Sequence, residues 1–134
     1  MSDLVQWLGA QLDEDEAIAI RAAEMGPWAL GDSPDDDPKA VYQGEYGSTL
    51  IECPRPADAA HVARQNPARV LREIDVKRQL LDLHAPGEMD YVDGDVCMAC
   101  DVRGGEPFYP CKTLRLLALP YADRPGYDAE RWGL

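Results

Sequence analysis

Several features of membrane, secreted and nucleic-acid-binding proteins are missing from this 134-residue chain. No apolar run approaches the roughly 18 to 20 residues needed to cross a bilayer. An acid, Asp3, stands where a secretory signal would begin its basic and then apolar segments. Bases are scarce, with 13 against 25 acids and a formal net charge of −12. We therefore expect a cytoplasmic protein with no membrane partner, whose field disfavours nucleic acid and favours basic partners.

The composition is otherwise that of a folded protein, with 46% apolar and 28% charged residues. At this length it predicts a single domain over residues 1–134 with one modest core. The charges are unevenly distributed, because residues 1–37 hold ten acids and one base whereas residues 55–78 hold six bases and three acids. If these two stretches face each other, part of the acid excess is neutralised within the molecule.

The hydrophobic pattern predicts an α+β fold that begins with a helix over residues 2–24, followed by a small antiparallel β-meander over residues 27–53. Residues 44–47, Gly-Glu-Tyr-Gly, are expected to form the hairpin turn between the last two strands. One face of the helix carries Leu4, Leu8, Leu12, Ile18, Ala19 and Ala22, together with Asp15. The acidic run over residues 13–16 is interpreted as a solvated surface.

Helices are predicted again over residues 56–84. Asn66 followed by Pro67 is a start signal, because Asn caps a helix well and Pro suits its first position. The helix that begins there should be the longest and most central one, and it should end near His84.

The last third of the chain is predicted as a cysteine-rich metal-binding segment with a short helix over residues 85–120 and a tail over residues 121–134. The short helix, residues 112–119, is very apolar and should be stopped by Pro120. Three aromatic residues of the tail indicate that it packs back on the body of the protein. They are Tyr121, Tyr127 and Trp132.

The cysteines predict a metal site. Four cysteines in a chain expected to be cytoplasmic favour metal ligation over disulfides. Cys97 and Cys100 form a Cys-x2-Cys turn that can present two sulfurs to one ion, and Cys111 follows a loop able to double back. A closed zinc site needs a fourth ligand, for which His84 at the end of the central helix is the leading candidate. The sequence therefore predicts a structural zinc ion.

Other interpretations of the cysteines remain open. Cys53, at the end of a predicted strand, could replace His84 and make a four-thiolate site for zinc or an iron–sulfur cluster. Cysteines without any metal are a further alternative. A thioredoxin-type redox role is disfavoured, because the Cys-x2-Cys pair follows an acidic loop and not the strand of a βαβ unit.

The remaining histidine, His61, lies one helical turn from Asp58 and could in principle serve as an oriented base. No nucleophile motif, Gly-rich phosphate loop or second catalytic carboxylate accompanies it. We therefore predict no enzymatic activity. His61 is interpreted as a packed or surface residue, and a second interpretation is that it forms part of a binding hot spot.

Several blocks of sequence together resemble a known family of small uncharacterised proteins from actinobacteria and their phages. The resemblance covers nearly the whole chain in the same order, and its last block is the most specific. The blocks are residues 3–5, 12–16, 26–28, 60–64 (Ala-His-Val-Ala-Arg), 67–74 (Pro-Ala-Arg-Val-Leu-Arg-Glu-Ile), 77–78, 110–123 (from Pro-Cys-Lys-Thr-Leu to Pro-Tyr-Ala-Asp) and 125–127.

The resemblance implies no activity, because the family's function is unknown. It does imply a Cys-x2-Cys pair ahead of a Pro-Cys step, similar to Cys97, Cys100 and Cys111 in this chain. Many members have a glycine after the second cysteine and a histidine near the tail, where this chain has Asp101 and Arg124. These departures would matter only if the family used that histidine as a ligand.

The function predicted from these features is that of a small, acidic, non-enzymatic and zinc-stabilised interaction or regulatory protein, of actinobacterial or phage origin, that binds a protein partner. We expect exposed aromatics near the tail, such as Trp132, to contribute to binding, together with the acidic run.

Two other functions use the charges differently. A DNA mimic would place carboxylates on one surface in the positions of phosphates. A nucleic-acid binder would instead use the basic helices over residues 64–78, although the net charge opposes it. Its basic residues would be Arg64, Arg69, Arg72, Lys77 and Arg78. A hydrolase with a metal-bound water would require an open coordination position.

Overall fold

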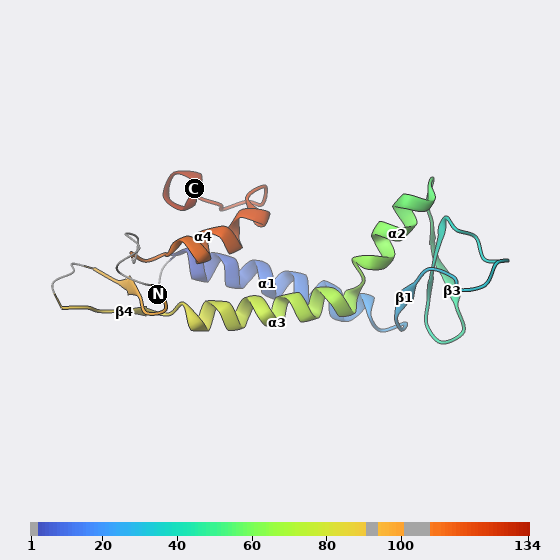
Figure 1. Ribbon diagram of the computed structural model, residues 1–134, viewed down its shortest axis with the longest axis horizontal. Helices are drawn as coiled ribbons and strands as arrows, with labels where there is room; N and C mark the ends of the chain where they lie inside the picture. The colour runs from blue at the N-terminus through green and yellow to red at the C-terminus, as the bar shows by residue number, and fades with distance from the viewer. Residues whose placement is uncertain (1–2, 91–93, 101–107) are drawn as a thin grey trace. The chain divides into compact units, whose positions relative to one another are not determined.

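The computed structural model describes residues 3–90, 94–100 and 108–134 (Figure 1). Helices and small antiparallel sheets are both present, so the predicted α+β class is confirmed. The chain forms two compact units. The terminal unit comprises Met1–Glu14 and Asp75–Leu134, and the middle unit comprises residues 15–74. Among the described residues, no helix combines the length and apolarity that crossing a membrane requires.

Two helices each contribute to both units. Helix α1 spans Asp3–Ala22 and helix α3 spans Pro67–Leu83, so each has residues in both units. The prediction of a single domain is not tested by this division. The first residue of the predicted helix over residues 2–24, Ser2, lies outside the described residues.

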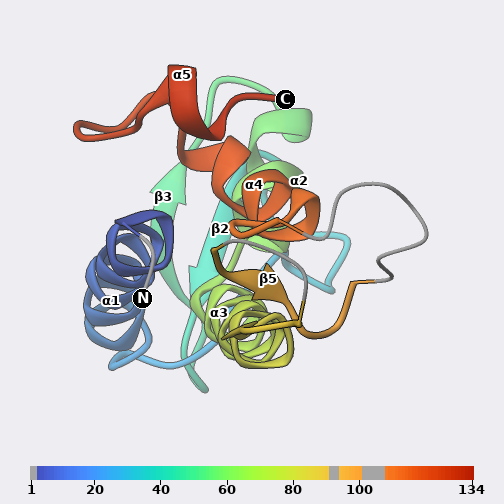
Figure 2. The same ribbon diagram turned by 90° about the vertical axis from the view of Figure 1, so that its left-hand side faces the viewer.

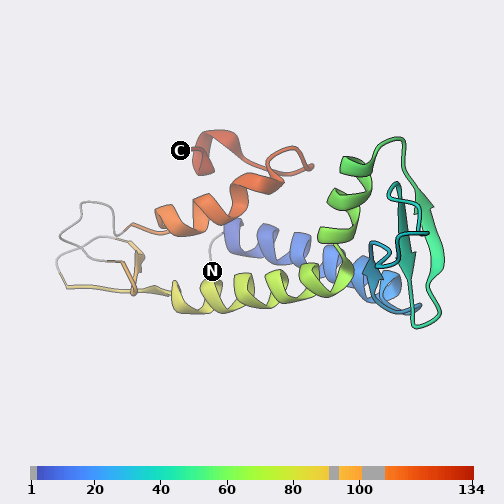
Figure 3. The same ribbon diagram turned by 45° about the vertical axis from the view of Figure 1, so that its right-hand side comes forward.

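The middle unit contains the predicted meander, with strands β1 (Trp28–Ala29), β2 (Ala40–Gln43) and β3 (Ser48–Glu52) in the order β1-β2-β3. Both strand pairs are antiparallel. Helix α2 (Pro56–Arg64) lies against the sheet (Figure 3). A small core of Val41, Ala59 and Ala63 joins the two, with Trp28, Leu50, Cys53 and Val62 packed against it.

Glycines shape the turns of this meander. Gly44 and Gly47 have φ angles of +78° and +65°, which an L side chain rarely adopts, so the predicted turn over residues 44–47 is confirmed. The backbone at Gly26 approaches Gly44 closely, since a Cβ atom on Gly26 would lie 2.6 Å from the Cα of Gly44. This contact lets the Gly44 N–H donate to the carbonyl of Pro27 at 3.0 Å.

The terminal unit groups the start of α1, the end of α3 and the helix α4 (Lys112–Ala118), as Figure 2 shows. Leu4, Leu8 and Leu12 are fully buried, which confirms the predicted apolar face of the first helix in this unit. Leu114 and Ala118 of α4 are also fully buried. Two short strands, β4 (Pro86–Gly87) and β5 (Val96–Cys97), form an antiparallel ribbon that the sequence pattern did not predict.

The tail packs back as predicted. Trp7, Tyr127 and Trp132 form an aromatic cluster with ring centroids 5.5–5.6 Å apart. The Trp7 indole N–H donates to the carbonyl of Pro125 at 2.9 Å. Arg131 pairs with Asp3 at 3.0 Å, so the last residues are held against the start of α1.

Three expectations about side chains and ends need correction. Trp132 is only 4% exposed, because the short helix α5 (Ala129–Trp132) turns its indole into the aromatic cluster. It is therefore not the exposed binding residue that its place in the tail suggested. Ile18 is 68% exposed although it shares the apolar face of α1. Pro120 does not end the helical path, because Leu119–Tyr121 continues α4 as a 3-10 turn, where a missing N–H is tolerated at the first positions.

The burial of Trp132 predicts a structural and not a binding defect when it is truncated. Trp132→Ala should lower the free energy of unfolding by about 3–5 kcal/mol, since it removes a buried indole and leaves a cavity. Tyr46→Ala, at a residue 95% exposed, should change it by less than about 0.5 kcal/mol. Urea unfolding followed by far-UV circular dichroism measures both. Equal stability of Trp132→Ala and the unmodified protein would contradict the packing described.

Candidate metal centre

His84 directly follows α3. Its backbone N–H donates to the carbonyl of Leu80 at 3.0 Å, which continues the hydrogen-bond pattern of the helix by one residue. The position of the imidazole is therefore set by a 17-residue helix, a rigid element compared with the short segments around it.

The ribbon of β4 and β5 brings the cysteines back to this helix end. Pro86 lies opposite Cys97 in the ribbon, and the Met98 N–H donates to the carbonyl of Ala85 at 3.2 Å. Val96 also forms a β-bridge with Phe108. Because Phe108 precedes Cys111 by three residues, this bridge returns the chain to the site, where Cys111 directly precedes α4.

The four side chains predicted as ligands lie together. The Nδ1 atom of His84 is 3.2 Å from the Sγ of Cys97, 3.7 Å from that of Cys100 and 3.6 Å from that of Cys111. All four donor atoms lie within 4.8 Å of one another. The predicted convergence is therefore observed, and it identifies Nδ1 as the nitrogen that faces the sulfurs.

These spacings fit a tetrahedral zinc ion. With Zn–N near 2.0–2.1 Å and Zn–S near 2.3 Å, tetrahedral geometry places nitrogen and sulfur about 3.6 Å apart. The three observed N···S distances lie close to this value. The donor set of three sulfurs and one imidazole is also among those that zinc prefers. The residues present therefore fit a zinc ion in the type and the spacing of their donor atoms.

Burial and hydrogen bonding act on the thiols in opposite directions. Cys97 and Cys111 are buried, and Cys100 is half-buried. Burial tends to raise the pKa of the Cys97 thiol, but hydrogen bonds from the Ala99 backbone, His84 and Cys100 outweigh it and lower the pKa to about 7. Burial and the neighbouring thiols Cys97 and Cys111 raise the pKa of Cys100 to about 12. Three thiolates this close repel one another, so a cation is needed to hold all three ionised.

Cys53 is not part of this group. All four cysteines lie in the described residues and each is a free thiol. Cys53 is half-buried in the middle unit, where it packs against the core of Val41, Ala59 and Ala63. The group of close donor atoms comprises His84, Cys97, Cys100 and Cys111 instead.

His61 lies on α2 and is exposed, in agreement with its interpretation as a surface residue. We expected Asp58 to pair with His61, but its carboxylate accepts hydrogen bonds from Arg55. The Arg55 guanidinium donates to it through Nε at 3.1 Å and Nη2 at 2.7 Å. The hydrogen bond from Arg55 lowers the pKa of Asp58. The sequence spacing favoured His61, but Arg55 three residues before Asp58 could have been recognised as an equally placed partner.

The basic residues predicted for binding are spread over α2 and α3. Arg64, Arg69 and Arg72 are exposed, and Arg69 pairs with Glu73 at 2.9 Å while also donating to the backbone carbonyl of Arg64. Further along α3, Arg78 pairs with Asp13 of α1 at 2.8 Å. This pair is an instance of the predicted contact between the acidic and basic stretches.

The comparisons with known proteins identify a family and nothing more specific. No curated protein and no solved structure matches the chain. The sequence model of a family of unknown function, DUF6221, matches residues 1–134. The origin in actinobacteria or phages stays a prediction. Because the match extends over the whole chain, this protein belongs to the family of unknown function DUF6221.

Proposed function

We propose that the chain is a zinc-stabilised, non-enzymatic protein that acts by binding a protein partner. The observation that carries the zinc assignment is the contact of one imidazole nitrogen, Nδ1 of His84, with three cysteine sulfurs at 3.2–3.7 Å. Each donor comes from a different structural context, namely the end of α3, the strand β5, the residue Cys100 after it, and the start of α4.

The proposed role of the zinc ion is structural. The segments that it would join are short, since β4 and β5 have two residues each and α4 has seven. Strands of this length contribute few hydrogen bonds. Bonds from one ion to the ligands on these segments would therefore supply much of the stability that keeps them attached to α3. Zinc therefore takes the place of a larger apolar core in this part of the terminal unit.

The ligand count supports a structural over a catalytic ion. A catalytic zinc keeps one position open for water or substrate, whereas a structural zinc is bound by four protein ligands. Three sulfurs and one nitrogen would supply all four ligands of a tetrahedral ion at this site.

The partner proposal is supported by charge. The chain carries 25 acids against 13 bases, which attracts basic surfaces and repels phosphate backbones. A protein with a basic face is therefore the partner class that the electrostatics favour, and the regulatory role predicted from the sequence is consistent with such binding.

The zinc assignment predicts the metal content of purified protein. Untagged protein should contain about one zinc ion per chain by elemental analysis, and Cys97→Ser and Cys111→Ser should each lose most of it together with cooperative melting of the terminal unit. Cys53→Ser is the matched control and should keep the full zinc content.

Two results would count against this assignment. Untagged protein that contains no zinc as purified, and that melts like its Cys97→Ser variant, would show that the thiols have no metal role. Loss of zinc in Cys53→Ser would instead assign the fourth ligand to that cysteine.

The ligand atom of His84 gives a second prediction. In zinc-loaded protein, His84 should be bound through Nδ1 and carry its proton on Nε2 at neutral pH, and two-bond ¹H–¹⁵N correlation spectra should show this pattern. His61, the only other histidine, is an internal control and should show the correlation pattern of an imidazole that binds no metal. A metal-bound Nε2 on His84 would disagree with the observed geometry.

A closed coordination sphere gives a third prediction. Protein loaded with Co²⁺ in place of zinc should show the absorption of tetrahedral cobalt with thiolate ligands, and cyanide at millimolar concentration should leave these bands unchanged. New bands at concentrations that do not remove the metal would reveal an open position. That result would support a catalytic metal and contradict the structural role.

A further inference from the structure

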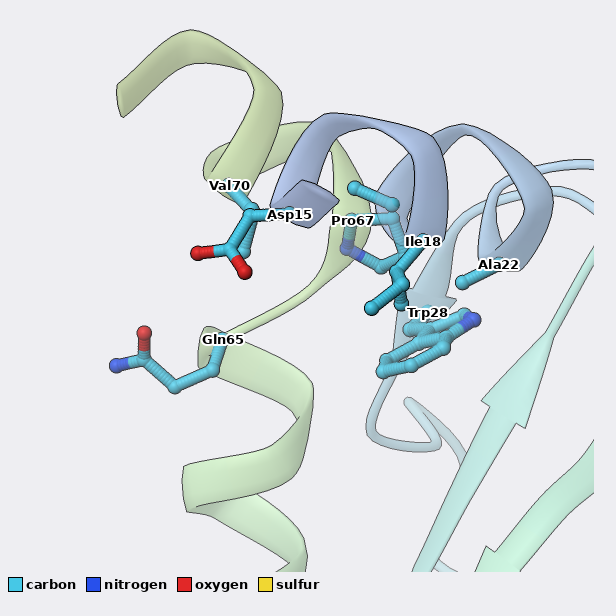
Figure 4. A pocket seen from close by; sticks show the side chains of 8 residues that line it. Asp15, Ile18, Ala22, Trp28, Gln65, Pro67 and Val70 are labelled. Atoms are coloured by element: carbon cyan, nitrogen blue, oxygen red, sulfur yellow. The ribbon is translucent and has the colours of Figure 1, made fainter. Parts of the chain in front are cut away.

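The middle unit has an apolar hollow that the proposed zinc centre does not involve. It has a volume of about 280 Å³ and lies between the second half of α1, the strand β1 and the junction of α2 with α3 (Figure 4). Eight described residues line it, all from this unit: Asp15, Ile18, Ala19, Ala22, Trp28, Gln65, Pro67 and Val70.

The walls of the hollow leave apolar surface uncovered. Ile18 projects over the Trp28 ring beside Pro67, as Figure 4 shows, yet Ile18 is 68% exposed. The helical periodicity of α1 places this residue on the apolar face, where a side chain is normally covered. Exposed apolar surface that is concentrated in a concave site is typical of a binding site, whereas single apolar residues on a convex surface are not.

The hollow is longer than one side chain needs. A second hollow, also of about 280 Å³, shares Trp28 and Pro67 with the first and extends along Gly26, Pro27 and Asn66. The two hollows are therefore adjacent subsites, and Trp28 and Pro67 line both of them. Adjacent subsites suit an extended segment of polypeptide better than a small compact molecule.

Charge indicates which segment fits. Asp15 is the one ionisable residue among those that line the two hollows, and its carboxylate lies on the same side as the Gln65 amide (Figure 4). The middle unit as a whole has eleven acids against six bases, a net charge of −5. An apolar site with an acidic edge in an acidic unit attracts an apolar group flanked by positive charge.

We propose that this hollow is the docking site for a segment of a basic protein partner, in which one large apolar side chain enters beside Ile18 and Trp28 while neighbouring Lys or Arg side chains face the acidic edge. The proposal rests on the proposed function of partner binding and names the surface and the partner chemistry. It is independent of the zinc centre, whose ligands all belong to the terminal unit.

The test uses full-length, zinc-loaded protein and three capped pentapeptides. The probe is Lys-Lys-Phe-Lys-Lys, and the controls are Lys-Lys-Ala-Lys-Lys, which lacks the apolar group, and Glu-Glu-Phe-Glu-Glu, which reverses the charge. The readout is the indole ¹H–¹⁵N signal of Trp28, assigned from its loss in Trp28→Phe. The signals of Trp7 and Trp132, both in the terminal unit, are internal references.

We expect the lysine and phenylalanine peptide to shift the Trp28 signal saturably, with each control peptide binding about tenfold more weakly or not at all. Ile18→Gln should weaken binding of the probe by a similar factor, because it removes apolar wall without adding charge. Ile20→Gln is the matched variant, since Ile20 is 52% exposed on the same helix and does not line the hollow. It should bind as the unmodified protein does.

The proposal is overturned if the alanine peptide binds as well as the probe, if the glutamate peptide does, or if Ile18→Gln has no effect. A Trp28 signal that shifts on dilution of the protein alone would assign the hollow to a second copy of the chain, and would also overturn it. Failure of all peptides with a full zinc content would refute this docking site while leaving the zinc proposal standing. Protein that contains no zinc but binds the probe would refute the zinc proposal alone.

Discussion

The convergence of three sulfurs and one imidazole nitrogen on one point is the constraint on which the terminal unit depends. Nδ1 of His84 and three sulfurs can approach to 3.2–3.7 Å only if the end of α3, the ribbon and the start of α4 meet there. Each of these segments except α3 is too short to be stable alone. A zinc ion at this point would convert weak local elements into one cross-linked structure, and would also neutralise the repulsion between neighbouring thiolates.

The chemistry of this site could be predicted from the sequence because it depends on residue type and spacing. The Cys-x2-Cys turn of Cys97 and Cys100 places two sulfurs together by local geometry, and the end of a long helical pattern located His84. The ribbon that delivers Cys97 to His84 could not be predicted, because its strands have two residues each and one of them is Pro-Gly. Such strands have no periodicity, and their pairing is decided by tertiary contacts.

Two of the expectations that failed, those on Trp132 and Ile18, share a different cause, since both concerned exposure and not residue type. Trp132 was expected at the surface because it is near the chain end, but its burial depends on a contact with Trp7, more than a hundred residues away in sequence. Ile18 was expected to be covered because helical periodicity reports only which face a residue occupies. Whether that face is covered depends on elements elsewhere in the chain, and at Ile18 it is partly left open.

The central claim is that three sulfurs and one imidazole nitrogen bind one zinc ion, and X-ray absorption spectroscopy at the zinc edge tests it most directly. The account predicts a first shell of three sulfur atoms at about 2.3 Å and one nitrogen at about 2.0–2.1 Å. A first shell made only of nitrogen and oxygen atoms, or one with fewer than three sulfurs, would contradict it.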